Sequence, residues 1–171
     1  MNRPLQPKEG EYAPYYENYV EYVRAYDLGE VLQNQIGELR SFLDGKEDFW
    51  FEKAYQEGKW TPKELIGHII DTERIFAYRS LCLARGEEGS LPGFDENAYV
   101  TTAAFNSVPV SVLLDDFELS RKSLLSMIRT IPEDAFVRSG EVNGNLMSCR
   151  ACLTIIAGHF IHHMNILKDR Y

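Results

Sequence analysis

The histidines are the residues of this 171-residue chain whose type and spacing could do chemistry. His68 lies near the middle of the chain, whereas His159, His162 and His163 lie close together toward its C-terminal end. Neutral imidazoles are common ligands of divalent transition metals, and imidazoles one helical turn apart can reach the same ion. The four histidines therefore raise the question of a metal site.

Helical geometry narrows the set of candidate ligands. Successive residues on a helix are rotated by about 100°, so His159 and His163 point within about 40° of each other. A His159–His162 pair, about 60° apart, is also compatible with one ion. We prefer His159 and His163, because they lie on or beside the apolar stripe of their segment, and His162 is then a rim residue. His68, on an apolar helix face of its own, would be the third ligand and would leave the metal an open position for water.

A structural interpretation of the same residues stays open at this point. A single inward histidine is more often a hydrogen-bonded core residue than a ligand, and histidine pairs at helical spacing also arise by chance. If His68 is a ligand, Asp71, close to one turn later, is expected to accept a hydrogen bond from its second ring nitrogen and so fix the tautomer. Glu73 and Arg74 are expected to form an exposed ion pair.

Other side chains with chemical potential are expected to be structural. Arg79 and Arg121 could bind an anionic substrate or close salt bridges within the fold, and we favour the second role for both. The three cysteines are an odd number, which does not suggest a disulfide framework. Cys149 and Cys152 form a CxxC pair, but no second pair accompanies it, so we interpret them as small core residues at the start of a helix.

Composition limits the classes of partner and location. The net charge of −8 and the lack of a cluster of Lys and Arg argue against binding of nucleic acid. No stretch approaches the roughly 20 apolar residues of a membrane span, and the N-terminal residues lack the apolar core of a signal peptide. A hydrophobic content of 44% in 171 residues is typical of one packed domain. We therefore expect a single cytoplasmic domain, residues 1–171, with no membrane contact.

Helical periodicity predicts four long amphipathic helices. They are expected at residues 28–43, 62–85, 110–131 and 149–171. The second has the clearest start, because Thr61 is a good N-cap, Pro62 suits the first turn, and Glu64 lies three residues after the cap. Four such helices joined by one long crossover, residues 86–108, describe an all-α four-helix bundle, in which facing helices can build a metal site.

The segments between these helices are expected to contain little regular structure. Residues 1–14, rich in proline, are expected to form an N-terminal arm, and the tyrosines that follow recur at the spacing of a short amphipathic turn. Residues 46–59, 86–108 and 132–147 are expected to be loops with short turns at most, and no segment alternates as a strand would. The 86–108 loop and the N-terminal tyrosines are expected to wall a pocket.

Both histidine segments, taken with the residues between them, resemble a known family. The matching parts are Trp60–Arg74, Arg79, Leu91–Glu96 and Ile156–His163, in this order. They are similar to the DinB-like superfamily, which includes the YfiT-type metal-dependent hydrolases and bacterial thiol-dependent S-transferases, and the resemblance extends from about Tyr15 to Tyr171. It implies an up-down-down-up bundle with a divalent metal, nickel or zinc, held by His68, His159 and His163. It also implies frequent homodimerisation.

The resemblance leaves two classes of function open. The first is a metal-dependent enzyme that activates a thiol cosubstrate, such as bacillithiol, or a water molecule, and so acts as an S-transferase or a hydrolase on a small molecule. No separate serine or cysteine nucleophile with a paired base is evident, so the ion would do the activating in either reaction. The second is a non-catalytic, stress-associated dimeric bundle whose metal is structural or absent.

Overall fold

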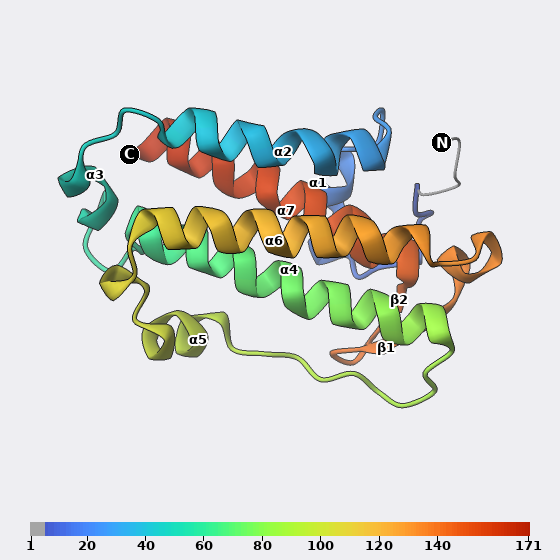
Figure 1. Ribbon diagram of the computed structural model, residues 1–171. Helices are drawn as coiled ribbons and strands as arrows, with labels where there is room; N and C mark the ends of the chain where they lie inside the picture. The colour runs from blue at the N-terminus through green and yellow to red at the C-terminus, as the bar shows by residue number, and fades with distance from the viewer. Residues whose placement is uncertain (1–5) are drawn as a thin grey trace.

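Four long helices form the body of the protein, whose computed structural model describes residues 6–171 (Figure 1). They are α2 (Leu28–Leu43), α4 (Pro62–Arg85), α6 (Val110–Arg129) and α7 (Cys149–Arg170). Helices α2 and α7 run in one direction and α4 and α6 in the other, so the order is up-down-down-up. The predicted four-helix bundle is therefore confirmed. None of the helices in residues 6–171 has the length and apolar character needed to cross a bilayer.

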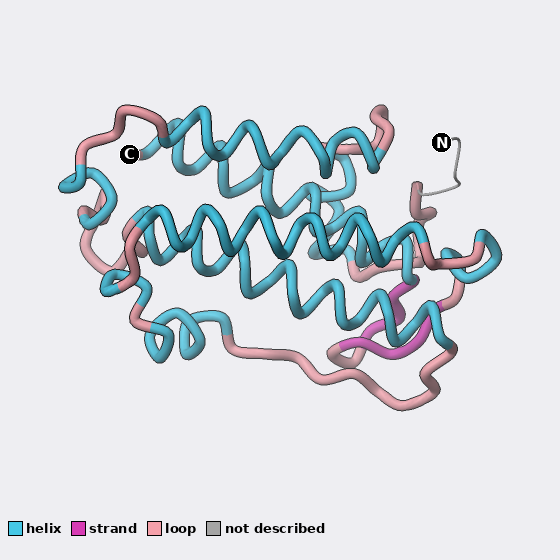
Figure 2. Tube along the Cα trace, in the orientation of Figure 1, coloured by secondary structure: helices cyan, strands magenta, loops and turns pink. Residues whose placement is uncertain are grey.

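Shorter elements precede the first of these four helices and connect them to one another, as Figure 2 shows. They are η1 (Pro14–Tyr16), α1 (Glu17–Glu21), α3 (Asp48–Glu52), α5 (Glu96–Ala103), η2 (Phe105–Ser107), η3 (Glu133–Val137), β1 (Ser139–Val142) and β2 (Asn145–Ser148). The crossover between α4 and α6 thus contains a helix of its own, which corrects the prediction of a loop over residues 86–108. Its Asp95 side chain caps α5 by accepting a hydrogen bond from Ala98 N at 3.0 Å.

Residues 139–148 form a β-hairpin, so the prediction that no segment is a strand was wrong. The strands pair antiparallel from Ser139 opposite Ser148 to Val142 opposite Asn145. Asn143 and Gly144 make the turn with φ values of 50° and 73°, the left-handed conformations that the tightest hairpin turns require. Leu91 of the crossover pairs with this turn, since Asn143 N donates to its carbonyl at 2.8 Å. The hairpin therefore fixes the path of the crossover.

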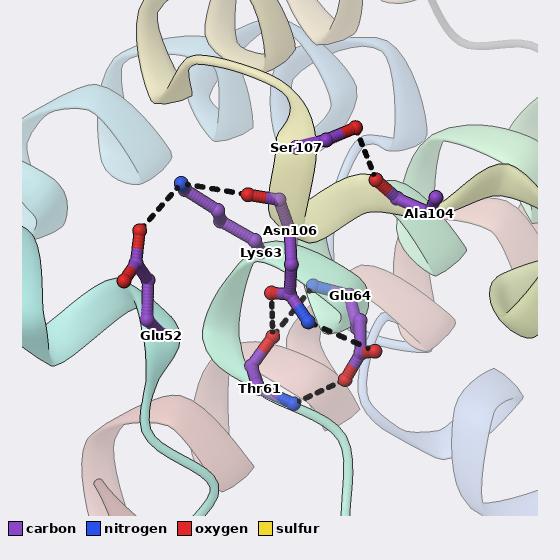
Figure 3. Close-up of polar contacts among 7 residues, drawn as sticks. All are labelled: Glu52, Thr61, Lys63, Glu64, Ala104, Asn106 and Ser107. Atoms are coloured by element: carbon purple, nitrogen blue, oxygen red, sulfur yellow. Dashed lines mark hydrogen bonds and ion pairs between the residues drawn. The ribbon is translucent and has the colours of Figure 1, made fainter.

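A polar cluster holds the start of α4 (Figure 3). The predicted capping box is present: Glu64 N donates to Thr61 Oγ1 at 3.2 Å, and Thr61 N donates to Glu64 Oε2 at 2.7 Å. Asn106 of η2 accepts from the Thr61 hydroxyl at 2.7 Å and donates to Glu64 at 3.1 Å. Lys63 adds contacts with Glu52 of α3 and with the Asn106 carbonyl. These bonds fix the first turn of α4, less than two turns before His68.

Arg121 joins all four long helices from the centre of the bundle, which confirms a structural role for it. From α6, its Nε donates to Glu73 Oε2 of α4 at 2.8 Å, and its Nη1 donates to the carbonyl of Leu32 in α2 at 3.1 Å. Nη1 also donates to the Gln35 side chain, whose Nε2 donates in turn to the Ala157 carbonyl of α7 at 2.9 Å. Arg121 is fully buried.

The prediction of an exposed ion pair between Glu73 and Arg74 was wrong. Neighbouring residues of a helix point about 100° apart, so the two side chains cannot share a face. Glu73 turns inward to Arg121, and Arg74 turns outward to Asp116 of α6 at 2.5 Å. The two charges therefore act in separate ion pairs.

Cys149 and Cys152 are small core residues, as predicted. Both are free thiols, fully buried in the first turn of α7. Burial raises the pKa of the Cys149 thiol to about 12, and it raises the pKa of Cys152 as well. Because the thiolate is the reactive form, neither residue is suited to redox chemistry.

Candidate metal centre

Three imidazoles meet where α4 packs against α7. His159 Nε2 lies 3.0 Å from His68 Nε2 and 2.9 Å from His163 Nε2, and the potential ligand atoms of the three residues all lie within 4.8 Å of one another. A tetrahedral ion with Zn–N distances of about 2.0–2.1 Å separates its ligand nitrogens by roughly 3.3 Å. The donor type and the spacing of these residues therefore fit a divalent transition metal.

Burial keeps these three imidazoles in the form that a metal needs. Each is at most 7% exposed. Burial lowers the pKa of His68 to about 4, and burial together with the neighbouring histidines lowers the pKa values of His159 and His163 well below the ordinary value. A neutral imidazole has a free lone pair, so no proton has to leave before an ion binds at neutral pH.

The same pKa shifts predict how the metal-free protein responds to acid. Unfolded histidines have a pKa near 6.5, so between about pH 6.5 and 4 the unfolded chain binds more protons at these positions than the folded chain does. The free energy of unfolding should therefore be constant above about pH 6.5 and fall as the pH is lowered through this range. Urea titrations of EDTA-treated protein at pH 7.5, 6.5 and 5.5 measure the slope.

A His159→Gln variant provides the control for this pH dependence. Glutamine cannot titrate, so the variant should lose less stability than the wild type between pH 7.5 and 5.5. Carboxyl groups stay largely ionised in this interval and contribute little to the difference. Equal slopes for the two proteins would contradict the assignment of the slope to the buried histidines.

Thr72 lies beside Nδ1 of His68, the ring nitrogen that does not face the other two histidines. Its hydroxyl oxygen lies 3.5 Å from His68 Nδ1, one helical turn along α4. Asp71, which the sequence had suggested for this contact, is half-buried and makes no hydrogen bond to His68 in residues 6–171. The nearby charges that act on its carboxylate are those of Arg74 and Asp116. A role for Asp71 in orienting the centre stays a prediction.

A glycine precedes the first candidate ligand on each of the two helices. At Gly158, a Cβ atom would collide with the backbone carbonyl of Tyr19, so α1 lies directly on α7 beside His159. At Gly67, a Cβ atom would collide with the ring of Phe105. The absence of side chains at these two positions lets neighbouring segments close around the histidines.

Replacing Gly158 with alanine should lower the free energy of unfolding by about 1–3 kcal/mol, the usual cost of overpacking. The clash is with backbone atoms, which no change of rotamer relieves. Gly37→Ala is the matched control, because Gly37 is exposed on α2 with open space around it, and alanine there should be neutral or stabilise by up to about 1 kcal/mol. Urea denaturation of both variants checks the prediction, and equal effects would contradict it.

A pocket of about 190 Å³ opens over the three imidazoles. As predicted, the N-terminal tyrosines and the crossover form part of its wall. The residues that line the pocket, apart from the three histidines of the centre, are Tyr15, Tyr16, Tyr19, Trp60, Thr72, Phe76, Phe94, Glu96, Ile155 and His162. His162 lies on this wall, 5.3 Å from the Tyr19 ring, and is not one of the three residues whose nitrogens converge. The pocket gives a small molecule access to the centre.

Trp60 and Phe76 are pocket residues that the sequence pattern did not single out. The Trp60 ring centroid lies 4.7 Å from that of His68. Phe76 lies two turns after His68 on the same helix, a spacing that could have identified it. Trp60 precedes the N-cap of α4, where no periodicity predicts the direction of a side chain.

Comparison with known proteins identifies relatives of this fold. The family model of the DinB superfamily matches residues 32–167. Two proteins of Oceanobacillus iheyensis, both named "Putative metal-dependent hydrolase", are 27% and 26% identical over 142 and 140 residues, which is 81% of this chain and 79% and 76% of theirs.

Two solved structures share the architecture. YfiT from Bacillus subtilis, described as "a probable metal-dependent hydrolase with an unusual four-helix bundle topology", superposes with a TM-score of 0.77 over 95% of this chain and 89% of its own, at 16% identity. A mycothiol-dependent maleylpyruvate isomerase superposes with a TM-score of 0.64 over 80% of this chain and 58% of its own, at 18% identity. With the family model covering most of its length, the chain belongs to the DinB superfamily.

Proposed function

We propose that this protein is a metal-dependent enzyme in which His68, His159 and His163 hold a divalent ion that activates a thiol or a water molecule. The observation that carries the proposal is the convergence of three buried, neutral imidazole nitrogens at the base of an open pocket. A structural metal site is usually closed by four protein ligands, whereas three ligands leave a position for a reactant. The names of the Oceanobacillus relatives support the metal dependence.

The protein's own residues would position the reactants. A divalent ion in this site would lower the pKa of a bound thiol or water toward neutrality. The nearby Trp60 and Phe76 rings limit the access of bulk water to the nucleophile, and Tyr19, packed on His159 with ring centroids 5.6 Å apart, covers the centre from the side of α1. In thiol transfer the thiol would give up its proton, its sulfur would form a bond to an electrophilic carbon, and the bond from that carbon to the leaving group would break. In hydrolysis a water oxygen would form the new bond in place of sulfur, with the same loss of a proton and of the leaving group.

Nickel or zinc is the ion that we propose, because imidazole nitrogen suits both. The substrate is a small molecule, given the volume of the pocket, and a low-molecular-weight thiol is the proposed cosubstrate. The mycothiol dependence of the isomerase with the same fold supports this choice. A homodimer and a cytoplasmic location stay predictions.

Incubation of nickel- or zinc-loaded protein with monochlorobimane, with and without bacillithiol, tests the reaction. An S-transferase forms the fluorescent bimane thioether, with release of chloride, only when thiol and metal are both present. Turnover that does not need the thiol would reject the transferase and leave the hydrolase. EDTA-treated protein is the control.

Elemental analysis of the purified protein tests the metal itself. We expect one nickel or zinc ion per chain and a melting temperature that rises when the ion is added to metal-free protein. If the protein holds no stoichiometric metal and neither ion changes its melting or its activity, the enzyme proposal fails and the non-catalytic bundle is left.

A further inference from the structure

Arg79 is a buried cation without a carboxylate partner. It is 3% exposed, and within residues 6–171 no Asp or Glu forms an ion pair with it. In the described part of the chain, the other two buried arginines are both paired, Arg121 with Glu73 and Arg150 with Glu11. A guanidinium is always charged in proteins, and a buried charge is strongly unfavourable unless it is paired. Arg79 is therefore the exception that needs an explanation.

The contacts of Arg79 leave most of its hydrogen-bonding capacity unused. Nη2 donates to the Pro92 carbonyl at 2.7 Å, which is its single hydrogen bond within residues 6–171. The guanidinium carbon lies 4.8 Å from the centre of the Phe76 ring and 5.8 Å from that of Phe94. A guanidinium has five N–H donors in a planar fork. Burial without a carboxylate lowers the pKa of Arg79, whereas the hydrogen bond with Glu11 raises that of Arg150.

Arg79 lines a second cavity, of about 290 Å³, between α4 and the crossover. Most of the lining is apolar or aromatic and includes Ile75, Leu91, Pro92, Phe94 and Tyr99. Phe94 also lines the pocket over the three histidines, so the two cavities are neighbours. The other arginine of this cavity, Arg74, already has Asp116 as its partner.

We propose that this second cavity binds a small organic molecule that carries one carboxylate group, held by the Arg79 guanidinium. The carboxylate would supply the missing counter-charge, in a geometry that the guanidinium fork matches with two parallel hydrogen bonds. The apolar lining would pack on the body of the molecule. A monoanion fits better than a phosphate dianion, because the cavity offers a single unpaired cation. The proposal goes beyond the reaction at the histidines and does not depend on it.

Titration calorimetry with benzoate tests this site, on metal-free protein so that the histidine centre is not involved. Benzamide, which has the same shape and no charge, and inorganic phosphate are the comparison ligands. We expect benzoate to bind the wild type at least about tenfold more tightly than benzamide, the usual effect of a charged hydrogen bond. Benzamide binding as tightly as benzoate, or phosphate binding more tightly, would overturn the proposal.

Two variants assign the binding to Arg79. Arg79→Met should weaken benzoate binding at least about tenfold, whereas Arg74→Gln, in the same cavity but at a paired arginine, should change it less than about twofold. An Arg79→Met protein that binds benzoate like the wild type would overturn the assignment. If this variant does not fold, chemical shift changes at Phe94 and Tyr99 in the wild type decide. They should reach half their full size at a concentration of benzoate at least about tenfold lower than of benzamide, and changes elsewhere alone would reject the site.

Discussion

Replacing Arg121 with methionine should lower the free energy of unfolding by about 3–5 kcal/mol, the usual effect of removing one partner of a buried ion pair. The variant would leave the Glu73 carboxylate in the centre of the bundle without the partner of its Oε2, and within residues 6–171 its Oε1 has no hydrogen-bond partner. It would also remove the donor to the Leu32 carbonyl and the Gln35 side chain. Urea denaturation measures the loss.

Two further variants separate the stranded charge from the lost packing. Arg121→Met combined with Glu73→Gln should recover part of the stability, because no unpaired charge is then buried. Arg40→Met removes an arginine that pairs with Asp115 and Glu118 on the exposed surface, and it should cost less than about 1 kcal/mol. A double variant no more stable than Arg121→Met alone would contradict the electrostatic explanation.

The second large effect is expected at the centre itself. His159→Ala should abolish stoichiometric metal binding and, with it, the rise in melting temperature on addition of nickel or zinc, because His159 Nε2 lies within 3.0 Å of both other ring nitrogens. His162→Ala should keep the metal and the thermal shift, because His162 lies on the pocket wall.

Elemental analysis and thermal melts of these two variants, side by side, check the ligand set. The pair is well matched, since both remove one imidazole from the same helix within one turn. Loss of metal from the His162 variant, or its retention in the His159 variant, would contradict the assignment. Measurement of the metal keeps this result independent of whether the correct substrate has been found.

The parts of the fold that local sequence determines were predicted well. The bounds of α4 follow from the capping box at Thr61 and from Gly86, and α7 begins at Cys149 as predicted, after the N-cap Ser148. Cap and periodicity signals act within a few residues, so they can be read from one sequence. The convergence of the three histidines could be predicted for the same reason, because the direction of a side chain on a helix follows from its position. Their role as metal ligands stays a prediction.

The parts that depend on distant contacts were not predicted. Each strand of the hairpin has four residues, too short for an alternating pattern, and only the turn residues Asn143 and Gly144 marked it. Helix α5 buries only Val100, so it lacks an apolar stripe. Glu73 appeared to be half of an exposed pair because its partner, Arg121, is 48 residues away in the sequence.

The arrangement of the four long helices also has a consequence for how the chain folds. His68 on α4 and His159 on α7 are 91 residues apart in the sequence. Between them the chain passes through α6, which runs parallel to α4, and two parallel helices cannot be joined by a short turn. The chain must therefore close a long loop before α4 meets α7, a step that is entropically costly and slow compared with the docking of successive helices. A partly folded chain without this contact has no three-histidine site, so an ion that needs all three imidazoles binds only after α4 and α7 have come together.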